Sequence, residues 1–298
     1  MTRTLLIPLL FLTPLLSNGC RPRGGAAPAD TLYLGETQSM AEVVAAVNAN
    51  NAALPTLWAR HYFEANIVDE KKDSHFVNGE GVLLYKAPRG MRLVGTKAAA
   101  GTVFEIGSTE DRYWLTLVPD RDTMWWGWYR NLGKPCVDEK VIPVRPDLVL
   151  EVLGVSTIDT NFLAAPVPTM RFNNDADAYM FVWNAPAGDR WAAQKEIWYD
   201  RATKEPRRVL LFDGDGRVVL RAFLSRHEPV EVPEVARENW PKAPRIYDLY
   251  FPETGAKMRL ELDEVALERR GVPTRRGITF PEDPKAGQVI QLDQGCAD

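Results

Sequence analysis

The segment Glu196–Phe223, EIWYDRATKEPRRVLLFDGDGRVVLRAF, shows most clearly how this chain folds. Its apolar and polar residues alternate, which is typical of strands with one buried and one exposed face. Turn-forming residues interrupt the alternation, and the DGDG run at Asp213–Gly216 is short enough for a hairpin. The segment and its flanks therefore predict three consecutive strands, at Gln194–Asp200, Pro206–Phe212 and Arg217–Ser225.

The same alternation continues in both directions from this segment. Toward the N-terminus, Leu57–Ile67 predicts a long half-buried strand, and an amphipathic helix precedes it at Gln38–Leu54, with Ser39 and Glu42 as a capping box. A second, short helix begins beside Pro146. Short polar turns separate the other strands, as in an antiparallel meander. These strands are predicted at Gly81–Lys86, Met91–Gly95, Thr102–Ile106, Arg112–Val118, Met124–Arg130, Thr169–Phe172, Ala178–Ala185, Ile246–Phe251 and Ala256–Asp263.

This pattern lacks an internal repeat and the alternating strand and helix of a parallel sheet. We therefore expect a mainly β (α+β) protein built on one continuous antiparallel sheet. The chain has 298 residues, and 45% of them are hydrophobic, which suits an ordinary globular protein. Its formal net charge of -4, with basic residues scattered among acidic ones, argues against nucleic acid as a partner.

The predicted strand at Met124–Arg130 contains the unusual run MWWGWY. Because strand side chains alternate between faces, Trp126 and Trp128 lie on one face while Trp125 and Tyr129 lie on the other. Both faces of this strand must therefore be shielded from water. The rings either fill a core between sheet and helix or line a pocket for a ligand.

The N-terminus is typical of an exported protein. Residues 1–19 have a basic start, an apolar run and small residues at the end, which predicts a signal peptide too short to cross a bilayer as a helix. The end of this segment resembles the lipobox of bacterial lipoproteins, with Gly19 before a lipidated Cys20. It departs from that pattern at Ser17, where an aliphatic residue is usual. Ordinary signal cleavage is the alternative.

Residues 20–30 predict a flexible tether between a lipid anchor and a folded domain at 31–298. Such an anchor would hold the protein on a membrane. Two further cysteines, Cys136 and Cys296, form an even pair in an exported chain. They predict either a disulfide or two free thiols.

The order of these parts resembles the LolA/LolB-like lipoprotein carriers. The resemblance rests on a helix leading into a long strand, a meander, the RPDLVLEVLG helix at Arg145–Gly154, the segment at Glu196–Phe223 and the terminal ITFPEDPKAGQVIQLD at Ile278–Asp293. It implies one strongly curved, unclosed half-barrel covered by helices, with acyl chains held between sheet and helices. Together with the lipobox, it is closer to the membrane-anchored acceptor type than to the soluble carrier.

The resemblance also implies a site and a location. We expect an outer membrane lipoprotein that faces the periplasm and binds acyl chains of lipoproteins or lipids for transfer or retention. An envelope protein is a further possible partner, and a non-catalytic sensor or interaction module with a filled cavity is the alternative. The residues expected to line the cavity are Phe63, Leu93, Trp126, Trp128, Phe181 and Leu260.

No common catalytic motif occurs in the sequence. An acid and base pair would have to come from scattered carboxylates such as Glu151, Glu196 and Asp248. The histidines His61, His75 and His227 lack metal-ligand spacing, and His61 falls on an apolar strand face, which predicts a core histidine. The run at Asp213 lacks the later ligands of a calcium loop. We therefore expect no enzyme, no metal and no cofactor.

Overall fold

The computed structural model of the protein describes residues 36–68, 74–98, 100–118, 122–134, 136–137, 142, 146–269, 277–284 and 286–296. All of these ranges belong to the unit formed by Glu36–Asp298. The predicted signal peptide at 1–19, the lipidation site Cys20 and the tether at 20–30 lie outside the described residues.

Strands make up most of the described chain, as expected. The two α-helices are α1 (Met40–Ala52) and α2 (Pro146–Val152). The strands of the main sheet are β1 (Thr56–Val68), β2 (Ser74–Lys86), β3 (Gly90–Lys97), β4 (Gly101–Ser108), β5 (Arg112–Leu117), β6 (Thr123–Trp128), β7 (Val167–Asn173), β8 (Ala178–Ala187), β9 (Arg190–Asp200), β10 (Pro206–Phe212), β11 (Val218–Ser225), β14 (Ile246–Tyr250), β15 (Lys257–Ala266) and β16 (Gln288–Gln291). A separate ribbon is formed by β12 (Glu228–Pro229) and β13 (Lys242–Ala243).

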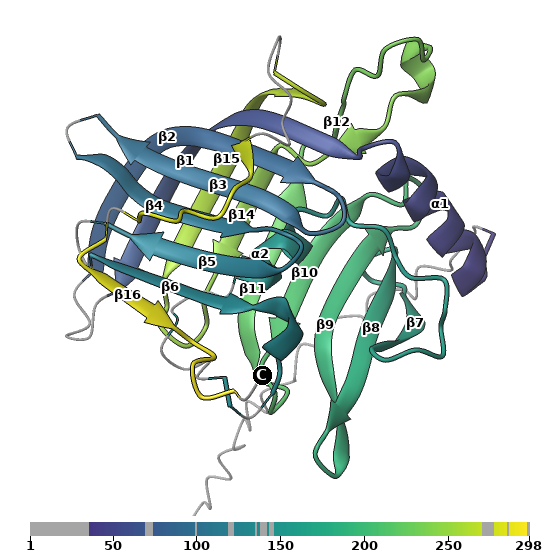
Figure 1. Ribbon diagram of the computed structural model, residues 1–298. Helices are drawn as coiled ribbons and strands as arrows, with labels where there is room; N and C mark the ends of the chain where they lie inside the picture. The colour runs from purple at the N-terminus through teal and green to yellow at the C-terminus, as the bar shows by residue number, and fades with distance from the viewer. Residues whose placement is uncertain are drawn as a thin grey trace, which may run out of the picture. The chain divides into compact units, whose positions relative to one another are not determined.

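Apart from β12 and β13, the described strands form one 14-stranded sheet in the order β16-β6-β5-β4-β3-β2-β1-β15-β14-β11-β10-β9-β8-β7. The sheet curves around α2, and its two edge strands, β16 and β7, do not pair with each other in the described chain (Figure 1). This confirms the predicted unclosed half-barrel. The meander that covers β1 to β6 is antiparallel, as are the hairpins from β7 to β11.

One edge differs from the fully antiparallel sheet that the sequence predicts. Strand β16 pairs in parallel with β6, with Gln288 opposite Thr123 and Gln291 opposite Trp126. The strand is only four residues long, so it carries too little alternation to be found from sequence. Its position depends on the path of the C-terminal segment across the sheet, which no local pattern encodes.

Glycines on the concave face of β2 and β3 make room for rings from the neighbouring strands. A Cβ atom on Gly79 would lie 2.7 Å from the ring of Phe63, and one on Gly95 would lie 2.2 Å from the ring of Phe104. The two rings meet over these glycines at a centroid distance of 5.0 Å. Because Phe63 lies on β1 and Phe104 on β4, this end of the concave face is filled by side chains.

Helix α1 begins as predicted, with the capping box of Ser39 and Glu42. The Glu42 N–H donates to Ser39 Oγ, and the Ser39 N–H donates to Glu42 Oε2. The buried face of the helix carries Val43, Val44 and Val47, which join the core of the half-barrel. The helix therefore covers part of the concave side.

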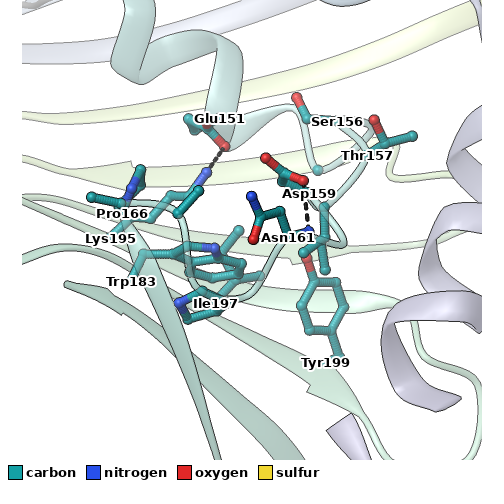
Figure 2. Close-up of a pocket in the computed structure, with 15 residues that line it drawn as sticks. Glu151, Ser156, Thr157, Asp159, Asn161, Pro166, Trp183, Lys195, Ile197 and Tyr199 are labelled. Atoms are coloured by element: carbon teal, nitrogen blue, oxygen red, sulfur yellow. Dashed lines mark hydrogen bonds and ion pairs between the residues drawn. The ribbon is translucent and has the colours of Figure 1, made fainter. Parts of the chain in front are cut away.

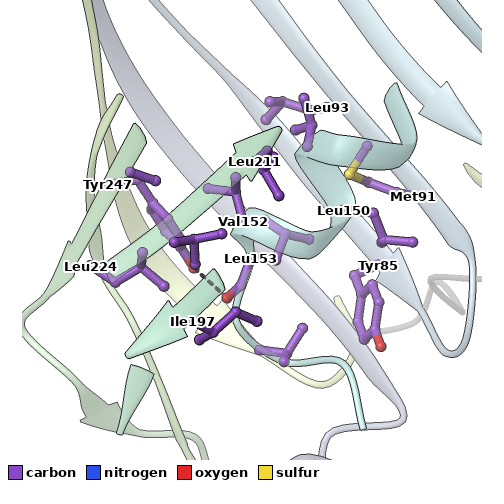
Figure 3. Close-up of a cluster of buried hydrophobic side chains, with 14 of the residues drawn as sticks. Tyr85, Met91, Leu93, Leu150, Val152, Leu153, Ile197, Leu211, Leu224 and Tyr247 are labelled. Carbon is purple, nitrogen blue, oxygen red and sulfur yellow. Dashed lines mark hydrogen bonds between the residues drawn. The ribbon is translucent and has the colours of Figure 1, made fainter. Parts of the chain in front are cut away.

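Helix α2 lies inside the curve of the sheet and contacts β4, β5 and β10. Its residues Leu150 and Val152, together with Leu153, pack among apolar side chains from both halves of the sheet (Figure 3). The Tyr247 hydroxyl donates to the Leu153 carbonyl at 3.3 Å. The concave face is thus largely occupied by the chain's own side chains. In the described part of the chain, no helix has the length and apolar character needed to cross a bilayer.

Candidate functional site

A cavity of about 260 Å³ opens beside α2. It lies between the loop that follows α2 and the concave face of β8 and β9 (Figure 2). Polar groups line one side and aromatic rings the other. The residues that define its chemistry are Glu151, Ser156, Asn161, Trp183, Lys195 and Tyr199.

An ion pair between helix and sheet borders the cavity. Lys195 Nζ on β9 lies 2.7 Å from Glu151 Oε2 on α2, and both side chains are half-buried, with exposed fractions of 20% and 30%. The same ammonium group lies 4.8 Å from the centroid of the Trp183 ring. A carboxylate and an aromatic face therefore hold this cation together.

Two buried tyrosines lie near this ion pair. Burial, together with the charge of Glu151, raises the pKa of Tyr85 to about 12, and a hydrogen bond to Ser156 acts in the opposite direction. Burial also raises the pKa of Tyr199, again with a contribution from Glu151. Both phenols therefore stay neutral at physiological pH. The charged groups beside them are the Lys195 ammonium and the Glu151 carboxylate.

The loop beside the cavity is held by α1. The Asn48 side chain donates to the Ile158 carbonyl at 2.8 Å and accepts from the Ile158 N–H at 2.7 Å. The Asn51 side chain donates to the Ser156 carbonyl at 2.8 Å. These asparagines satisfy the backbone of a partly buried loop, which would otherwise have unpaired polar groups.

Four of the six residues expected to line a cavity lie on the concave face of the sheet. Their exposed fractions are 3% or less, and all of them belong to the core that includes α1 and α2. These residues are Phe63, Leu93, Phe181 and Leu260. None of the four belongs to the lining of the cavity, but the Phe181 ring stacks on the lining residue Trp183 with a centroid distance of 5.7 Å. Ligand contact by these residues remains a prediction.

The other two, Trp126 and Trp128, lie on the opposite face of the sheet. Trp126 packs edge-on against Phe280 at 5.3 Å, and the guanidinium of Arg112 lies 4.6 Å from the Trp128 centroid. It is Trp125 that faces the core. The structure therefore does not bring these two tryptophans to the concave face, because the alternation along β6 directs Trp125 inward. Both faces of MWWGWY are shielded, one by the core and one by the segment around Phe280.

The scattered carboxylates do not form an acid and base pair. Glu151 pairs with Lys195, Asp248 pairs with Arg259 at 2.8 Å, and Glu196 accepts from the indole of a neighbouring tryptophan. The predicted hairpin at Asp213 is present, since its backbone carbonyl accepts from the Gly216 N–H at 3.0 Å. Among the described residues, no group of three or more His, Cys, Asp or Glu side chains is arranged to hold a metal ion.

The two remaining cysteines are joined in the structure. Cys136 and Cys296 form a disulfide with a Cα separation of 5.2 Å. The sequence left open whether these cysteines form a disulfide or stay free thiols, and in the structure they form the disulfide. It links the segment after β6 to the C-terminal end of the described chain.

Lys195 and the asparagines of α1 are functional candidates that the sequence reasoning missed. Lys195 lies on the concave face of β9, in the same row as Ile197 and Tyr199. Lysine is rare at inward-facing positions of a strand. The alternation that aligns Lys195 with Ile197 and Tyr199 could therefore have identified it as a candidate from the sequence.

Solved structures resemble this fold. A DUF1329 family protein from Desulfovibrio piger matches with a TM-score of 0.51 and 10% identity, over 82% of this chain and 100% of that one. A LolA superfamily protein from Nitrosomonas europaea matches with a TM-score of 0.48 and 11% identity, over 82% and 99%. A Vibrio parahaemolyticus domain named for outer membrane lipoprotein sorting matches with a TM-score of 0.43 and 12% identity, over 75% and 90%.

No protein-family model matches the sequence, and no curated protein matches it. At such low identities the structural likeness concerns the fold alone. What this chain shares with the Desulfovibrio piger protein is therefore the fold, which in this chain is a curved, unclosed sheet around a helix.

Proposed function

We propose that this protein is a non-catalytic lipoprotein of the cell envelope that binds acyl chains of lipids or lipoproteins, for transfer or retention at the outer membrane. In this proposal α2 covers the binding surface and is displaced by the ligand. The fold and the predicted lipobox at Cys20 support the assignment. The membrane would be reached through the N-terminal lipid anchor.

The observation that best supports this proposal is that α2 is a short helix held on the sheet by aliphatic side chains. The helix has seven residues, and an isolated helix of that length is not stable in water. It is held on the concave face by aliphatic packing of Val149, Leu150 and Val152, each at most 8% exposed. An acyl chain offers the same kind of surface, at about 0.8 kcal/mol per buried methylene.

The size of the cavity is the reason that this proposal includes a movement of the helix. Its volume of about 260 Å³ is below the range of about 300–1,000 Å³ that is usual for small-molecule pockets. A long acyl chain therefore needs the space that α2 occupies. The cavity adjoins that space, since Glu151 on α2 is part of its wall.

A matched pair of helix variants tests this proposal. Val152→Ala removes two buried methyl groups from α2, and Val47→Ala removes the same groups from α1; the two valines are 3% and 2% exposed. If α2 competes with the ligand, Val152→Ala should tighten palmitate binding by roughly three- to tenfold, because less free energy opposes its displacement. Val47→Ala should leave the affinity unchanged. Isothermal titration calorimetry on the full chain measures both.

A second candidate function is an interaction module of the same fold with a permanently filled interior. The observation that favours it is the group of exposed aromatic residues on the outer face, where Tyr62, Phe76 and Phe223 are 54%, 59% and 44% exposed. Exposed rings of this kind are enriched at protein contacts. Failure of palmitate to bind either the native chain or Val152→Ala would favour this second function over the first.

A further inference from the structure

We infer that the ligand is an anionic amphiphile, whose carboxylate or phosphate group takes the place of Glu151 at Lys195. This inference rests on the proposed function and specifies the ligand class. Its starting point is that the two partners of the half-buried ion pair belong to different elements, one to the sheet and one to the helix that covers it.

Displacement of α2 separates this ion pair. Glu151 leaves with the helix, whereas Lys195 stays on β9, where it is held between paired strands. The ammonium group then remains beside the Trp183 ring without the carboxylate that lies 2.7 Å away in the closed form. A ligand that fills the space of α2 covers this ammonium group again, and a covered cation without a counter-ion is unfavourable, so a ligand that supplies an anion at this position is preferred over a neutral one.

The other charged group of the cavity does not replace Glu151. Asp159 lies in the loop, and its Oδ1 atom accepts from the Asn161 N–H at 2.8 Å. Lys195 is the one basic residue among the described residues that line the cavity. An anionic head group therefore has a single positive partner there, and its position is fixed by the sheet.

Helix α2 already presents the chemistry of such a ligand. The Glu151 carboxylate points to the cavity and Lys195 (Figure 2), while Leu150, Val152 and Leu153 point into the apolar core (Figure 3). A carboxylate beside a row of aliphatic groups is also what a fatty acid offers. The head would meet Lys195 and the tail would occupy the space of the aliphatic side chains. The stacked rings of Trp183 and Phe181 lead from one region to the other.

The test compares palmitate with hexadecanol, which has a tail of equal length and a neutral head. For the native chain we expect palmitate to bind about tenfold more tightly than hexadecanol, as for one charge-assisted hydrogen bond. In Lys195→Gln this ratio should fall to about one. In Glu151→Gln and Lys195→Arg the ratio should stay at or above the native value. The ratio is informative because loosening of α2 affects both ligands equally.

Two further probes identify the source of the anion. A monoacyl glycerol phosphate should bind with a preference over hexadecanol that also depends on Lys195. Acetate, which has the head without the tail, should not compete with palmitate at equal concentration. Competition by acetate as strong as that of palmitate would overturn the inference, since it would show a simple anion site.

The outcomes separate this inference from the function on which it rests. Equal binding of palmitate and hexadecanol to the native chain would overturn the anionic preference and leave acyl binding in place. Loss of the preference in Lys195→Arg as well as in Lys195→Gln would also overturn it, because arginine keeps the charge. No binding of any amphiphile to any variant would overturn the proposed function itself.

Discussion

At the scale of single residues, His61 shows how the concave face limits the charge of a buried group. The side chain is 1% exposed, and its Nε2 atom lies 3.0 Å from the Val94 carbonyl oxygen. A carbonyl only accepts, so Nε2 carries the proton of a neutral ring. The Nδ1 atom is buried and has no hydrogen-bond partner among the described residues. A second proton on the ring would therefore have no acceptor.

This environment predicts a defined loss of stability in acid. Burial lowers the pKa of His61 from 6.5 to about 4, against a smaller opposing effect of the Val94 bond. Between these two values the unfolded chain binds a proton that the folded chain does not, so the free energy of unfolding falls as pH decreases from 6.5 to 4. The expected contribution is roughly 3 kcal/mol. Urea denaturation at several pH values measures it.

The variant His61→Gln isolates this contribution from that of the carboxylates. Glutamine can still donate to the Val94 carbonyl, but it does not titrate. The variant should therefore lose less stability than the native protein over the same pH range. Parallel curves for the two proteins would show that His61 is not the group responsible.

The glycines under the rings give a second prediction at this scale. In Gly79→Ala the new Cβ atom would lie 2.2 Å from the Thr96 carbonyl oxygen and 2.7 Å from the Phe63 ring. Neither a paired backbone nor a buried ring can move away freely, so we expect a loss of about 1–3 kcal/mol in thermal or urea unfolding. Gly214→Ala is the control, because nothing lies within 4 Å of its Cβ position. A loss of equal size in both variants would contradict the steric explanation.

At the scale of elements, α1 tests how much a local signal contributes. The Ser39 side chain accepts from the Glu42 N–H, and substituting a capping serine by alanine typically costs about 1 kcal/mol. We expect Ser39→Ala to lower the free energy of unfolding by about that amount. Glu42→Gln should cost less, since glutamine can also bond to the Ser39 N–H. A larger loss in Glu42→Gln than in Ser39→Ala would contradict the capping argument.

The elements that could be predicted from sequence are those whose signals are local. The capping box and the spacing of Val43, Val44 and Val47 predict α1, and alternation predicts most strands to within a few residues. The sequence did not predict the first half of β2, because Gly79 and Gly81 break its alternation. A side chain at either position would collide with a ring from β1. Strand β16 and the inward position of Trp125 depend on long-range packing, which local patterns do not contain.

The candidate site was harder to predict than the fold for the same reason. The ion pair of Lys195 with Glu151 joins residues from a strand and a helix that are distant in sequence. Neither residue belongs to a catalytic or ligand-binding motif, and each is a common surface type. Only the placement of α2 inside the curve of the sheet brings them together. The resemblance to a family supplied the half-barrel, but it did not supply this contact.

At the scale of the whole molecule, the β6 end of the antiparallel meander is secured by the C-terminal segment. Strand β16 pairs with β6, Phe280 packs on Trp114 and Trp126, and the Asp293 carboxylate accepts from the Asn131 side chain at 2.7 Å. The segment therefore covers the outer face of the sheet near its edge. Because an unpaired edge strand invites pairing with other chains, this covering also protects β6.

The disulfide between Cys136 and Cys296 should make the largest covalent contribution to this arrangement. It closes a loop with a sequence separation of 160 residues, which restricts the unfolded chain strongly. We expect the double variant Cys136→Ser/Cys296→Ser to lose about 2–4 kcal/mol in urea denaturation. Dithiothreitol should lower the stability of the native protein by a similar amount and leave the variant unchanged. If the reductant destabilised both proteins equally, the effect would not come from this bond.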